Sequence, residues 1–459
     1  MKYILRPHCT PVGYLDHPYA MYDEKKRETL LLSREQFSIL LRCSGEAELD
    51  MDALSKKGAA FLRRLLRLHC VEPAQDGECR EVFRDYRFYS APYYRRAEWS
   101  ITGACNSRCR HCFMSARYGH YGNIPTDKCL EICRQLAECG IREVTLTGGE
   151  PLLRKNFLQI VDGLTANGVV ICAILTNGTL LRQELLEGLR ERGLRPSFQL
   201  SYDGVGYHDQ MRGVEGAEEK VIRALDLLKE YDFPVNVTMC LARCNQHTLL
   251  DTLQVCLAHG IGKFRVFQAR AEGEFLSHPE EFLPYEEVLR CYEECIPTIV
   301  RAKVPITVQL GEVLLLKANG KGCVHNFNRR FPAGKKNAPV RMSGEIYISP
   351  RGVLLPRFGL LTPETERLFP NVFETPLCDI LSGKAYNAQS LCRVADYLQR
   401  NPECDGCEHF RRCIMAWSGS GVVKDSGDLY RKNENICFYM KNGWRERLEK
   451  VYRDALTEP

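Results

Sequence analysis

Three cysteines stand close together in the segment ITGACNSRCRHCFM, which covers residues 101–114. They are Cys105, Cys109 and Cys112, and their spacing is C-x₃-C-x₂-C. A structural zinc ion takes four protein ligands, and disulfide bonds use cysteines in pairs, so three thiols fit neither. Three thiolates do suit a four-iron cluster, because one iron then keeps a coordination position open for a small molecule.

A second group of cysteines lies near the end of the sequence. The segment CDGCEHFRRC carries Cys404, Cys407 and Cys413, and Cys437 follows in NENICFYM. Four thiols hold either zinc or an iron–sulfur cluster, and the spacing by itself favours zinc. The chain has 23 cysteines in all. We expect those outside the two groups to be buried free thiols, because an unpaired cysteine packs as a small apolar side chain.

The composition limits the class of protein. The 459 residues carry a net charge of +5, which is mild for this length and does not indicate a nucleic-acid partner. The sequence has no apolar run of about 18 residues that would predict a membrane span. The first residues lack the long apolar stretch of a secretion signal, so we expect a cytoplasmic protein. Many thiols in such a protein favour metal or cluster ligands over a disulfide framework.

The elements that position the first cysteines follow from a repeated pattern. From residue 99 the chain alternates helical segments with the strand-like segments EWSITGAC, REVTLTGGEPLL, VVICAILTNG, SFQLSYDG, PVNVTMCLA and KFRVFQAR. Such units predict a parallel sheet, either open or closed into a partial barrel, with helices outside. Chemistry in these folds lies at the carboxyl ends of the strands. The cysteine loop, GGEP, TNG and SYDG all occupy such ends, which predicts one shared site.

This ordered set of motifs resembles the radical S-adenosylmethionine (radical SAM) enzymes, closely so over residues 95–275. The resemblance implies an α/β fold with a partial (β/α)6 barrel. It also implies that Cys105, Cys109 and Cys112 ligate a [4Fe–4S] cluster whose fourth iron is chelated by SAM. One electron would then cleave SAM to a 5′-deoxyadenosyl radical, which abstracts hydrogen from a substrate. The cofactor supplies the difficult chemistry, and the protein aligns it.

The same resemblance assigns roles to residues at the other strand ends. Gly148 and Gly149 would let the backbone approach the ligand closely, and Glu150 would bind the ammonium group of SAM. Further polar groups suit the ribose or the amino-acid end of SAM, and these are Asn177, Ser201 and Asp203.

Two more residues have alternative interpretations. His111 stands where the family usually has an aromatic residue near the adenine, or it is an ordinary loop histidine. Arg212, in HDQMRG, would pair with the carboxylate of SAM or form a surface ion pair.

After a radical SAM core, the C-terminal cysteines resemble the SPASM extension, which carries auxiliary [4Fe–4S] clusters. A full extension holds two clusters, but this sequence lacks some of the cysteines that they need. Arg357 and Trp417 occupy two of those positions, and Arg341 and Met342 stand where a third is expected. We therefore expect one auxiliary cluster, with the ligands Cys404, Cys407, Cys413 and Cys437.

An auxiliary cluster with four protein ligands has no open iron for a substrate. Electron transfer or structural support is then its remaining function. A redox-neutral reaction would instead need a thiol that returns a hydrogen atom. The candidate donors are Cys240, Cys244 and Cys323, each of which is otherwise a buried bystander. We expect Cys323 to be structural or catalytic rather than a cluster ligand.

Residues 1–90 predict a small α+β module of winged-helix character, which resembles the precursor-recognition domain of peptide-modifying radical SAM enzymes. Such a module binds a leader peptide by adding it as a strand to an exposed sheet edge. The alternative is a plain cap on the next domain. The sequence then predicts this module at 1–90, a radical SAM core at 91–277, a helical bridge at 278–339 and a SPASM-like domain at 340–459.

Together these features favour a maturase that modifies a ribosomally synthesised precursor peptide by a cross-link, a thioether or an epimerisation. The expected partners are that peptide, its leader held by the N-terminal module, and an electron donor such as flavodoxin or ferredoxin, with no nucleic acid and no membrane. Two alternatives stay open. One is a radical SAM enzyme that acts on a non-peptide substrate such as a tetrapyrrole side chain. The other is a non-enzymatic protein that binds zinc and peptides.

Overall fold

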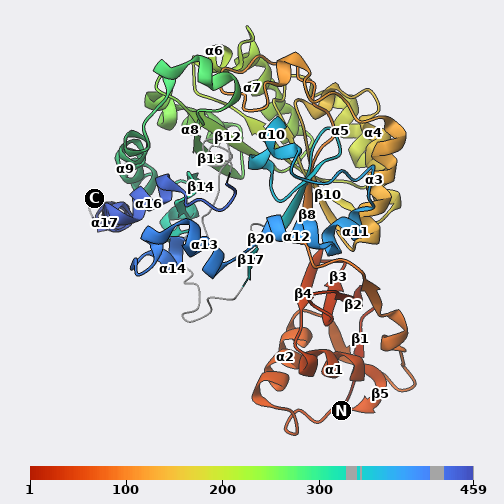
Figure 1. Ribbon diagram of the computed structural model, residues 1–459. Coiled ribbons are helices and arrows are strands. Elements are labelled where there is room, and N and C mark those ends of the chain that lie inside the picture. The colour runs from red at the N-terminus through yellow and green to blue at the C-terminus, as the bar shows by residue number, and fades with distance from the viewer. Residues whose placement is uncertain (327–338, 342–343, 414–427, 458–459) are drawn as a thin grey trace.

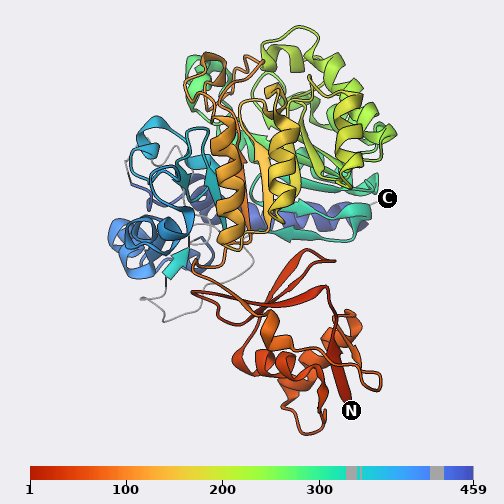
Figure 2. The same cartoon turned by 90° about the vertical axis from the view of Figure 1, so that its right-hand side faces the viewer.

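The computed structural model describes residues 1–326, 339–341, 344–413 and 428–457 (Figure 1). Three bodies can be followed along the chain. An N-terminal module of two small sheets and two helices is joined to a large sheet that is covered by helices. The C-terminal part packs beside this large sheet (Figure 2).

The large sheet has the strand order β16-β15-β14-β13-β12-β11-β10-β9-β8-β18-β19. Each predicted strand forms, because apolar side chains recur at alternate positions along it and are buried. Neighbours from β8 to β14 pair in parallel. Their bounds are β8 (Arg96–Ser100), β9 (Glu143–Thr147), β10 (Val170–Thr176), β11 (Ser197–Ser201), β12 (Val235–Leu241), β13 (Lys263–Gln268) and β14 (Thr307–Leu310). The predicted parallel α/β architecture is thereby confirmed.

Amphipathic helices connect these strands and cover the outside of the sheet (Figure 2). In α7 (Ala217–Glu230), for example, Val221, Leu225 and Leu228 recur at helical spacing and are fully buried. Burial of each such side chain contributes about 1.5–3 kcal/mol relative to exposure. The other connecting helices are α3 (Thr126–Glu138), α4 (Phe157–Ala166), α5 (Gln183–Glu191), α6 (His208–Arg212), α8 (Leu249–Ala258) and α9 (Tyr285–Arg301).

The sheet continues past both ends of the predicted core. Strand β18 (Glu345–Ile348) pairs in parallel with β8, and β19 (Leu354–Leu355) follows it in an antiparallel pair. At the other edge, β15 (Leu314–Leu316) and β16 (Cys323–His325) extend the sheet beyond β14. The domain boundaries at 277 and 339 therefore stay predictions, and hydrogen bonding of the sheet runs across both of them.

The N-terminal module contains a three-stranded sheet of order β5-β1-β6 and a four-stranded sheet of order β4-β3-β2-β7. Helix α1 is capped at its start by Ser33, whose side chain accepts a hydrogen bond from Gln36 N. The elements are β1 (Lys2–Leu5), β2 (Cys9–Tyr14), β3 (Ala20–Asp23), β4 (Glu28–Leu31), α1 (Arg34–Arg42), β5 (Ser44–Glu48), α2 (Lys56–Arg67), β6 (Val71–Pro73) and β7 (Arg87–Tyr89).

The module contacts the core at the amino-terminal end of β9. The Tyr14 hydroxyl donates to the carbonyl of Gly140 at 3.2 Å, and the Arg142 guanidinium lies over the ring of Tyr22. Both Gly140 and Arg142 precede β9, whereas the GGEP segment follows it. The N-terminal module and the motif-bearing strand ends therefore lie at opposite ends of this strand.

The C-terminal part consists mainly of short helices, with one small two-stranded sheet formed by β17 and β20. Its long helix α17 packs along α9 of the core (Figure 1). The elements are β17 (Pro339–Arg341), α10 (Pro363–Glu366), α11 (Leu377–Ser382), α12 (Lys384–Ser390), β20 (Leu391–Arg393), α13 (Val394–Arg400), α14 (Phe410–Cys413), α16 (Glu434–Lys441) and α17 (Trp444–Thr457).

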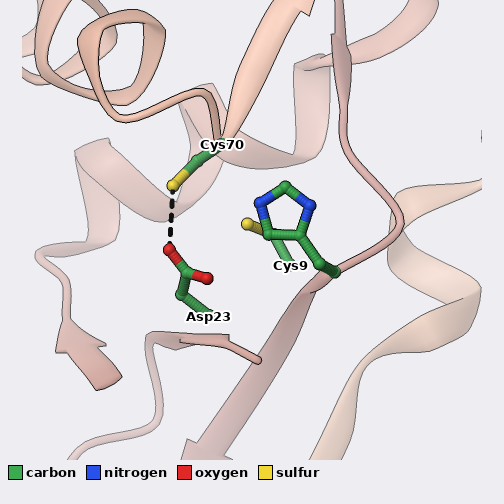
Figure 3. Close-up of side chains that lie close together, drawn as sticks. Cys9, Asp23 and Cys70 are labelled. Atoms are coloured by element: carbon green, nitrogen blue, oxygen red, sulfur yellow. Dashed lines mark hydrogen bonds between the residues drawn. The ribbon is translucent and has the colours of Figure 1, made fainter. Parts of the chain in front are cut away.

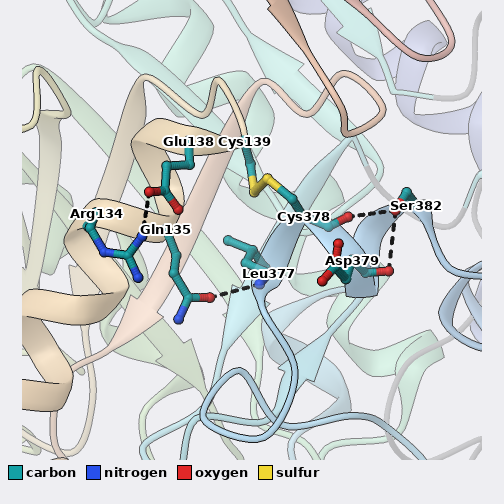
Figure 4. The surroundings of a disulfide bond; sticks show 8 residues. All are labelled: Arg134, Gln135, Glu138, Cys139, Leu377, Cys378, Asp379 and Ser382. Atoms are coloured by element: carbon teal, nitrogen blue, oxygen red, sulfur yellow. Dashed lines mark hydrogen bonds and ion pairs between the residues drawn. A yellow bond between two sulfur atoms is a disulfide. The ribbon is translucent and has the colours of Figure 1, made fainter.

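One pair of cysteines departs from the expectation of free thiols. Cys139, at the end of α3, forms a disulfide with Cys378 of α11 (Figure 4). Their Cα atoms lie 5.4 Å apart, which is within the range that a disulfide spans. The sequence could not indicate this pair, because 239 residues separate the two cysteines and packing of α11 on α3 brings them together.

No helix in the described part of the chain is both long enough and apolar enough to cross a membrane.

Beside the disulfide, Gln135 provides a testable link between α3 and the C-terminal part. Its side-chain amide donates to the carbonyl of Val372 at 3.2 Å. It also accepts a hydrogen bond from Leu377 N at 2.7 Å (Figure 4). We predict that Gln135→Ala lowers the free energy of unfolding by about 1–3 kcal/mol, because it leaves buried backbone groups unpaired. Denaturant unfolding measures this loss. The control is Arg134→Ala, which removes only an exposed ion pair on the same helix and should change stability by less than about 1 kcal/mol.

Candidate functional site

The three predicted cysteines lie on the loop that follows β8, and each sulfur atom accepts a hydrogen bond. Ser107 N donates to Cys105 Sγ at 3.4 Å, and Ala116 N donates to Cys112 Sγ at 3.4 Å. Cys109 Sγ receives a bond of 3.5 Å from the Arg212 guanidinium. Bonds of this kind favour thiolate over thiol, and in metal sites they orient the ligands and tune the metal.

Burial opposes the charged form of these thiols when no cation is present. It raises the pKa of Cys105 to about 12 and also raises the pKa of Cys112. Among the described residues, the three sulfur atoms do not all lie within 4.8 Å of one another. Tetrahedral zinc with Zn–S bonds of about 2.3 Å would place sulfur atoms roughly 3.8 Å apart. The loop therefore suits a positively charged group that is larger than one zinc ion.

The Gly-Gly pair after β9 lies against the backbone of the cysteine loop. A Cβ atom on Gly148 would lie 2.4 Å from the carbonyl oxygen of Thr102, and one on Gly149 would lie 2.2 Å from that of Ala104. Gly148 also has a φ of +151°, which side chains disfavour. The close approach expected of these glycines is thus made to the loop that carries the thiols.

The Glu150 carboxylate is fully buried and joins the ends of β9 and β10. It accepts hydrogen bonds from Leu152 N, from the Thr176 hydroxyl at 2.7 Å and from Asn177 N at 2.8 Å. Burial raises its pKa, and these donors oppose that rise. Two bonds fall on Oε1 and one on Oε2, so Oε2 retains acceptor capacity.

Asn177 connects the end of β10 to the cysteine loop. Its side-chain amide donates to Asn106 Oδ1 at 2.8 Å and to the Ser107 hydroxyl at 3.0 Å. Ser201 is the last residue of β11, half-buried and opposite Thr238 of β12. The structure thus brings GGEP, TNG and the cysteine loop into direct contact, as the shared strand-end site predicted.

Beneath the cysteine loop lies a buried charge network centred on Asp203. The Arg212 guanidinium contacts Asp203 Oδ2 at 2.7 Å, and His111 Nε2 lies 3.6 Å from the same oxygen. Burial raises the pKa of Asp203, but Arg212 and His111 hold it below the ordinary value. Burial lowers the pKa of His111 to about 4, so its imidazole is neutral. Arg212 is therefore paired inside the protein, and the surface ion pair considered for it does not form.

Of the residues that support this network, sequence reasoning missed His208 and Asn245 and named Cys240 only as a candidate hydrogen donor. His208 Nδ1 accepts a bond from Asp203 N, Asn245 donates to the carbonyl of Asp203, and Cys240 N donates to its carboxylate at 2.9 Å. They come from α6, the segment after β12 and β12 itself. A lone histidine or asparagine at such a position has no spacing signal that would identify it.

The three candidate hydrogen-donor thiols lie in different surroundings. Cys240 Sγ lies within 4.8 Å of a ring nitrogen of His111 and a carboxylate oxygen of Asp203. Cys244 Sγ contacts Met211 Sδ at 3.7 Å. Cys323 lies on the edge strand β16, near Glu449 of α17. Of the three, Cys240 is the one that adjoins His111, which directly precedes Cys112 in the cysteine loop.

The four C-terminal cysteines line one cavity between α13, α14 and α16. Cys404, Cys407, Cys413 and Cys437 share it with the apolar side chains of Tyr397, Phe410, Ile436 and Met440. Burial raises the pKa of Cys404 to about 11 and that of Cys413 to about 12. In the described part of the chain, no three of these sulfur atoms lie within 4.8 Å of one another. Their spread is too wide for a single tetrahedral zinc ion.

The positions that lack the expected cysteines are only partly visible. Arg357 is half-buried after β19, with the charges of Glu312 and Glu98 nearby. Arg341 ends β17. Trp417 and Met342 lie outside the described residues.

Comparison with known protein families identifies one domain of this chain. Residues 99–256 match the radical SAM superfamily. This part of the chain is a radical SAM domain. The cysteine loop of this domain, with a hydrogen bond to each of three sulfur atoms, fits the [4Fe–4S] cluster of that family.

Curated relatives of two kinds align with much of the chain. An AdoMet-dependent heme synthase from Methanosarcina barkeri is 26% identical over 351 residues, which cover 75% of this chain and 96% of that protein. A PqqA peptide cyclase from Granulibacter bethesdensis is 26% identical over 324 residues, which cover 70% of this chain and 80% of that protein.

The fold also resembles a solved structure along most of its length. SuiB from Streptococcus suis, bound to S-adenosylmethionine, superimposes with a TM-score of 0.66 and 14% identity. The superposition covers 94% of this chain and 99% of SuiB. A second structure holds SuiB with its precursor peptide SuiA and gives a TM-score of 0.62, with 12% identity and the same coverage.

The contact between the Gly-Gly pair and the cysteine loop can be tested directly. We predict that Gly149→Ala displaces this loop and lowers the iron content by about four per chain, the content of one [4Fe–4S] cluster. Iron analysis after anaerobic purification measures the loss. Gly344→Ala is the matched control, because a Cβ there meets no atom within 4 Å. A Gly149→Ala protein with full iron content would show that the loop does not depend on this contact.

Proposed function

We propose that this radical SAM enzyme is a maturase that modifies a ribosomally synthesised precursor peptide, whose leader is held by the N-terminal module. It works with SAM, a [4Fe–4S] cluster on Cys105, Cys109 and Cys112, and one auxiliary [4Fe–4S] cluster on the four C-terminal cysteines. Reducing equivalents come from flavodoxin or ferredoxin in the cytoplasm. The modification is a cross-link, a thioether or an epimerisation.

Residues around the cysteine loop would hold and shield the reactive group. When bound, the cluster and SAM supply one-electron chemistry that abstracts hydrogen from a substrate. The free acceptor capacity of Glu150 Oε2 would bind the ammonium group of SAM. The guanidinium of Arg212 would orient the sulfur of Cys109, and the buried network beneath the loop would keep water away from it.

The C-terminal cavity is assigned to a cluster rather than to zinc because of the spread of its thiols. Its sulfur atoms are spread too widely for one zinc ion, and apolar and aromatic side chains line it, together with Glu403, His409, Lys432 and Lys441. Four cysteines would complete the coordination of a cube and leave no iron open. The auxiliary cluster would then pass electrons or stabilise this part of the fold, and it would not bind the substrate.

The N-terminal module is the observation that carries the assignment to a peptide substrate. Within the described part of the chain, β4 is an edge strand whose one partner is β3, and Leu31 at its end is 43% exposed. Natural edge strands are commonly protected by lysine or proline, and β4 has neither. An extended leader can add to such an edge through main-chain hydrogen bonds.

The length of the module supports the same substrate class. The likeness to SuiB leaves only about 6% of this chain uncovered, which is fewer residues than the predicted module contains. The heme synthase alignment spans nearly all of that enzyme and leaves a quarter of this chain unmatched. The superposition with SuiB covers more of this chain than that alignment does, and SuiB has also been solved with a precursor peptide, which supports a peptide substrate.

The position of the module constrains the substrate. The module meets the amino-terminal end of β9, and the cysteine loop lies at the carboxyl end. The five residues of β9 span roughly 17 Å. A leader bound to the module would therefore need at least about five extended residues before the modified position.

A second candidate function rests on a specific observation. The heme synthase of Methanosarcina barkeri is matched over 96% of its length, so a tetrapyrrole side chain is the alternative substrate. Mass spectrometry of a candidate precursor peptide co-expressed with the enzyme separates the two. A loss of two mass units from the peptide supports a peptide substrate. So does a peptide whose mass is unchanged in ordinary water but which incorporates deuterium when the reaction is run in deuterated water. An unmodified peptide together with turnover of a tetrapyrrole contradicts it.

The proposed auxiliary cluster can be tested by the iron content of a variant that lacks two of its ligands. Replacing Cys404 and Cys413 together by serine should lower the iron content from about eight to about four per chain, because four ligands hold one cube. Cys392→Ser is the control, since this buried thiol lies in the same part of the chain but does not line the cavity. If the protein without these substitutions already holds zinc and only about four irons per chain, the assignment is contradicted.

The proposed leader site on β4 can be tested by measuring how tightly the precursor peptide binds. Leu31→Asp should weaken binding of the precursor peptide at least tenfold, because it places a charge where the added strand would pack. Fluorescence anisotropy with a labelled leader measures this. Leu456→Asp on α17 is the control, since that leucine has a similar exposure of 52%. Equal affinity of the two variants would move the leader site away from β4.

An epimerisation would require a hydrogen donor, and the geometry favours Cys240. Burial raises its pKa to about 12, so the thiol keeps its hydrogen at neutral pH. Cys240→Ala should then abolish deuterium incorporation from solvent into the peptide while SAM cleavage continues. Cys244→Ala should retain incorporation. Loss of incorporation in Cys244→Ala alone would assign the donor to that residue instead.

A further inference from the structure

Four potential metal ligands converge in the N-terminal module, far along the sequence from both cysteine groups. They are His8, Cys9, Asp23 and Cys70, and one ligand atom from each lies within 4.8 Å of those of the other three. Cys9 and Cys70 have no exposed surface, Asp23 is 2% exposed, and His8 is half-buried. Cys70 Sγ donates to Asp23 Oδ2 at 3.4 Å (Figure 3).

The four residues come from elements that the fold brings together. His8 and Cys9 stand at the start of β2, and Asp23 lies opposite Cys9 at the end of β3. Cys70 directly precedes β6, which belongs to the other sheet of the module. The group therefore spans the junction between the two sheets.

From this convergence we propose that the N-terminal module contains a structural zinc site formed by His8, Cys9, Asp23 and Cys70. Two sulfur donors, one imidazole and one carboxylate are ligands that zinc accepts, and four protein ligands close a tetrahedral site. Zinc would replace the thiol protons, including the one that Cys70 now shares with Asp23. The ion would tie β2 and β3 to the segment before β6.

Neighbouring groups already orient and balance this donor set. Lys26 N donates to Asp23 Oδ1 at 3.1 Å, which leaves Oδ2 directed at the sulfur of Cys70. Lys26 Nζ lies 3.6 Å from the same Oδ2. Two thiolates and a carboxylate around Zn²⁺ carry one net negative charge, which this ammonium would compensate. Such supporting contacts are usual around metal ligands.

A disulfide between Cys9 and Cys70 is the competing explanation for the two buried thiols. It would leave the carboxylate and the imidazole at the same point without a function. Lys26 already pairs with the carboxylate, so the convergence of four ligand atoms, and not the burial of Asp23, favours zinc. The zinc site accounts for all four residues, and its test distinguishes it from the disulfide.

The experiment uses the full chain, purified anaerobically with its clusters and then incubated with zinc and dialysed. Mass-spectrometric metal analysis should find about one zinc per chain in addition to the iron. X-ray absorption at the zinc edge should find two sulfur atoms at about 2.3 Å and two nitrogen or oxygen atoms at about 2.0–2.2 Å. This signal is specific to zinc, so the iron–sulfur clusters do not interfere.

Variants separate this site from other thiols. Cys9→Ser and Cys70→Ser should lose the zinc and keep the iron, whereas Cys43→Ser, a buried thiol of the same module, should keep both. If the cysteine variants fail to fold, His8→Ala removes a half-buried ligand and should speed zinc loss to a chelator at least tenfold. Absence of zinc, four sulfur neighbours around it, or a Cys9–Cys70 disulfide in the alkylated protein would each overturn the proposal.

Discussion

The contact between the end of β9 and the cysteine loop is the constraint on which the site depends. Gly149 N donates to the carbonyl of Thr102, and Glu150 N donates to that of Ala104, both at 2.8 Å. These bonds form only because no side chain stands at the two glycines. The Glu150 carboxylate then fixes the end of β10 to the same edge. The backbone contact between the glycine pair and the cysteine loop therefore sets the position of the three thiols relative to β9 and β10.

The chemistry-bearing groups are distributed over three parts of the fold, each suited to one task. The carboxyl edge of the sheet holds an open set of three thiols above the buried Asp203–Arg212 pair. The C-terminal cavity holds a closed set of four. The N-terminal module, which contacts the core at the other end of β9, has a strand edge that no described residue pairs with. In the proposed function, separation of these parts would let a peptide be anchored in one place while a radical reaction is confined to another, where side chains exclude water.

Sequence patterns predicted the parallel strands well, because alternate burial leaves a local signal in each segment. The same patterns placed GGEP and TNG at strand ends beside the cysteines, and the structure confirms their contact. The extension of the sheet by β18 was not predictable, since its pairing with β8 joins segments almost 250 residues apart. Nor was the disulfide between Cys139 and Cys378, which depends on how α11 packs on α3.

The sequence by itself determined the family chemistry: three cysteines at a fixed spacing, followed in order by the glycine and asparagine motifs, left few other readings. Only the tertiary structure decided the surroundings of those residues. It paired Arg212 with Asp203 and Cys109, distinguished Cys240 from the other candidate thiols, and brought His8, Cys9, Asp23 and Cys70 together. The reason is physical. A ligand set on one loop is encoded by local spacing, whereas a buried charge or a site shared by several strands depends on contacts between distant segments.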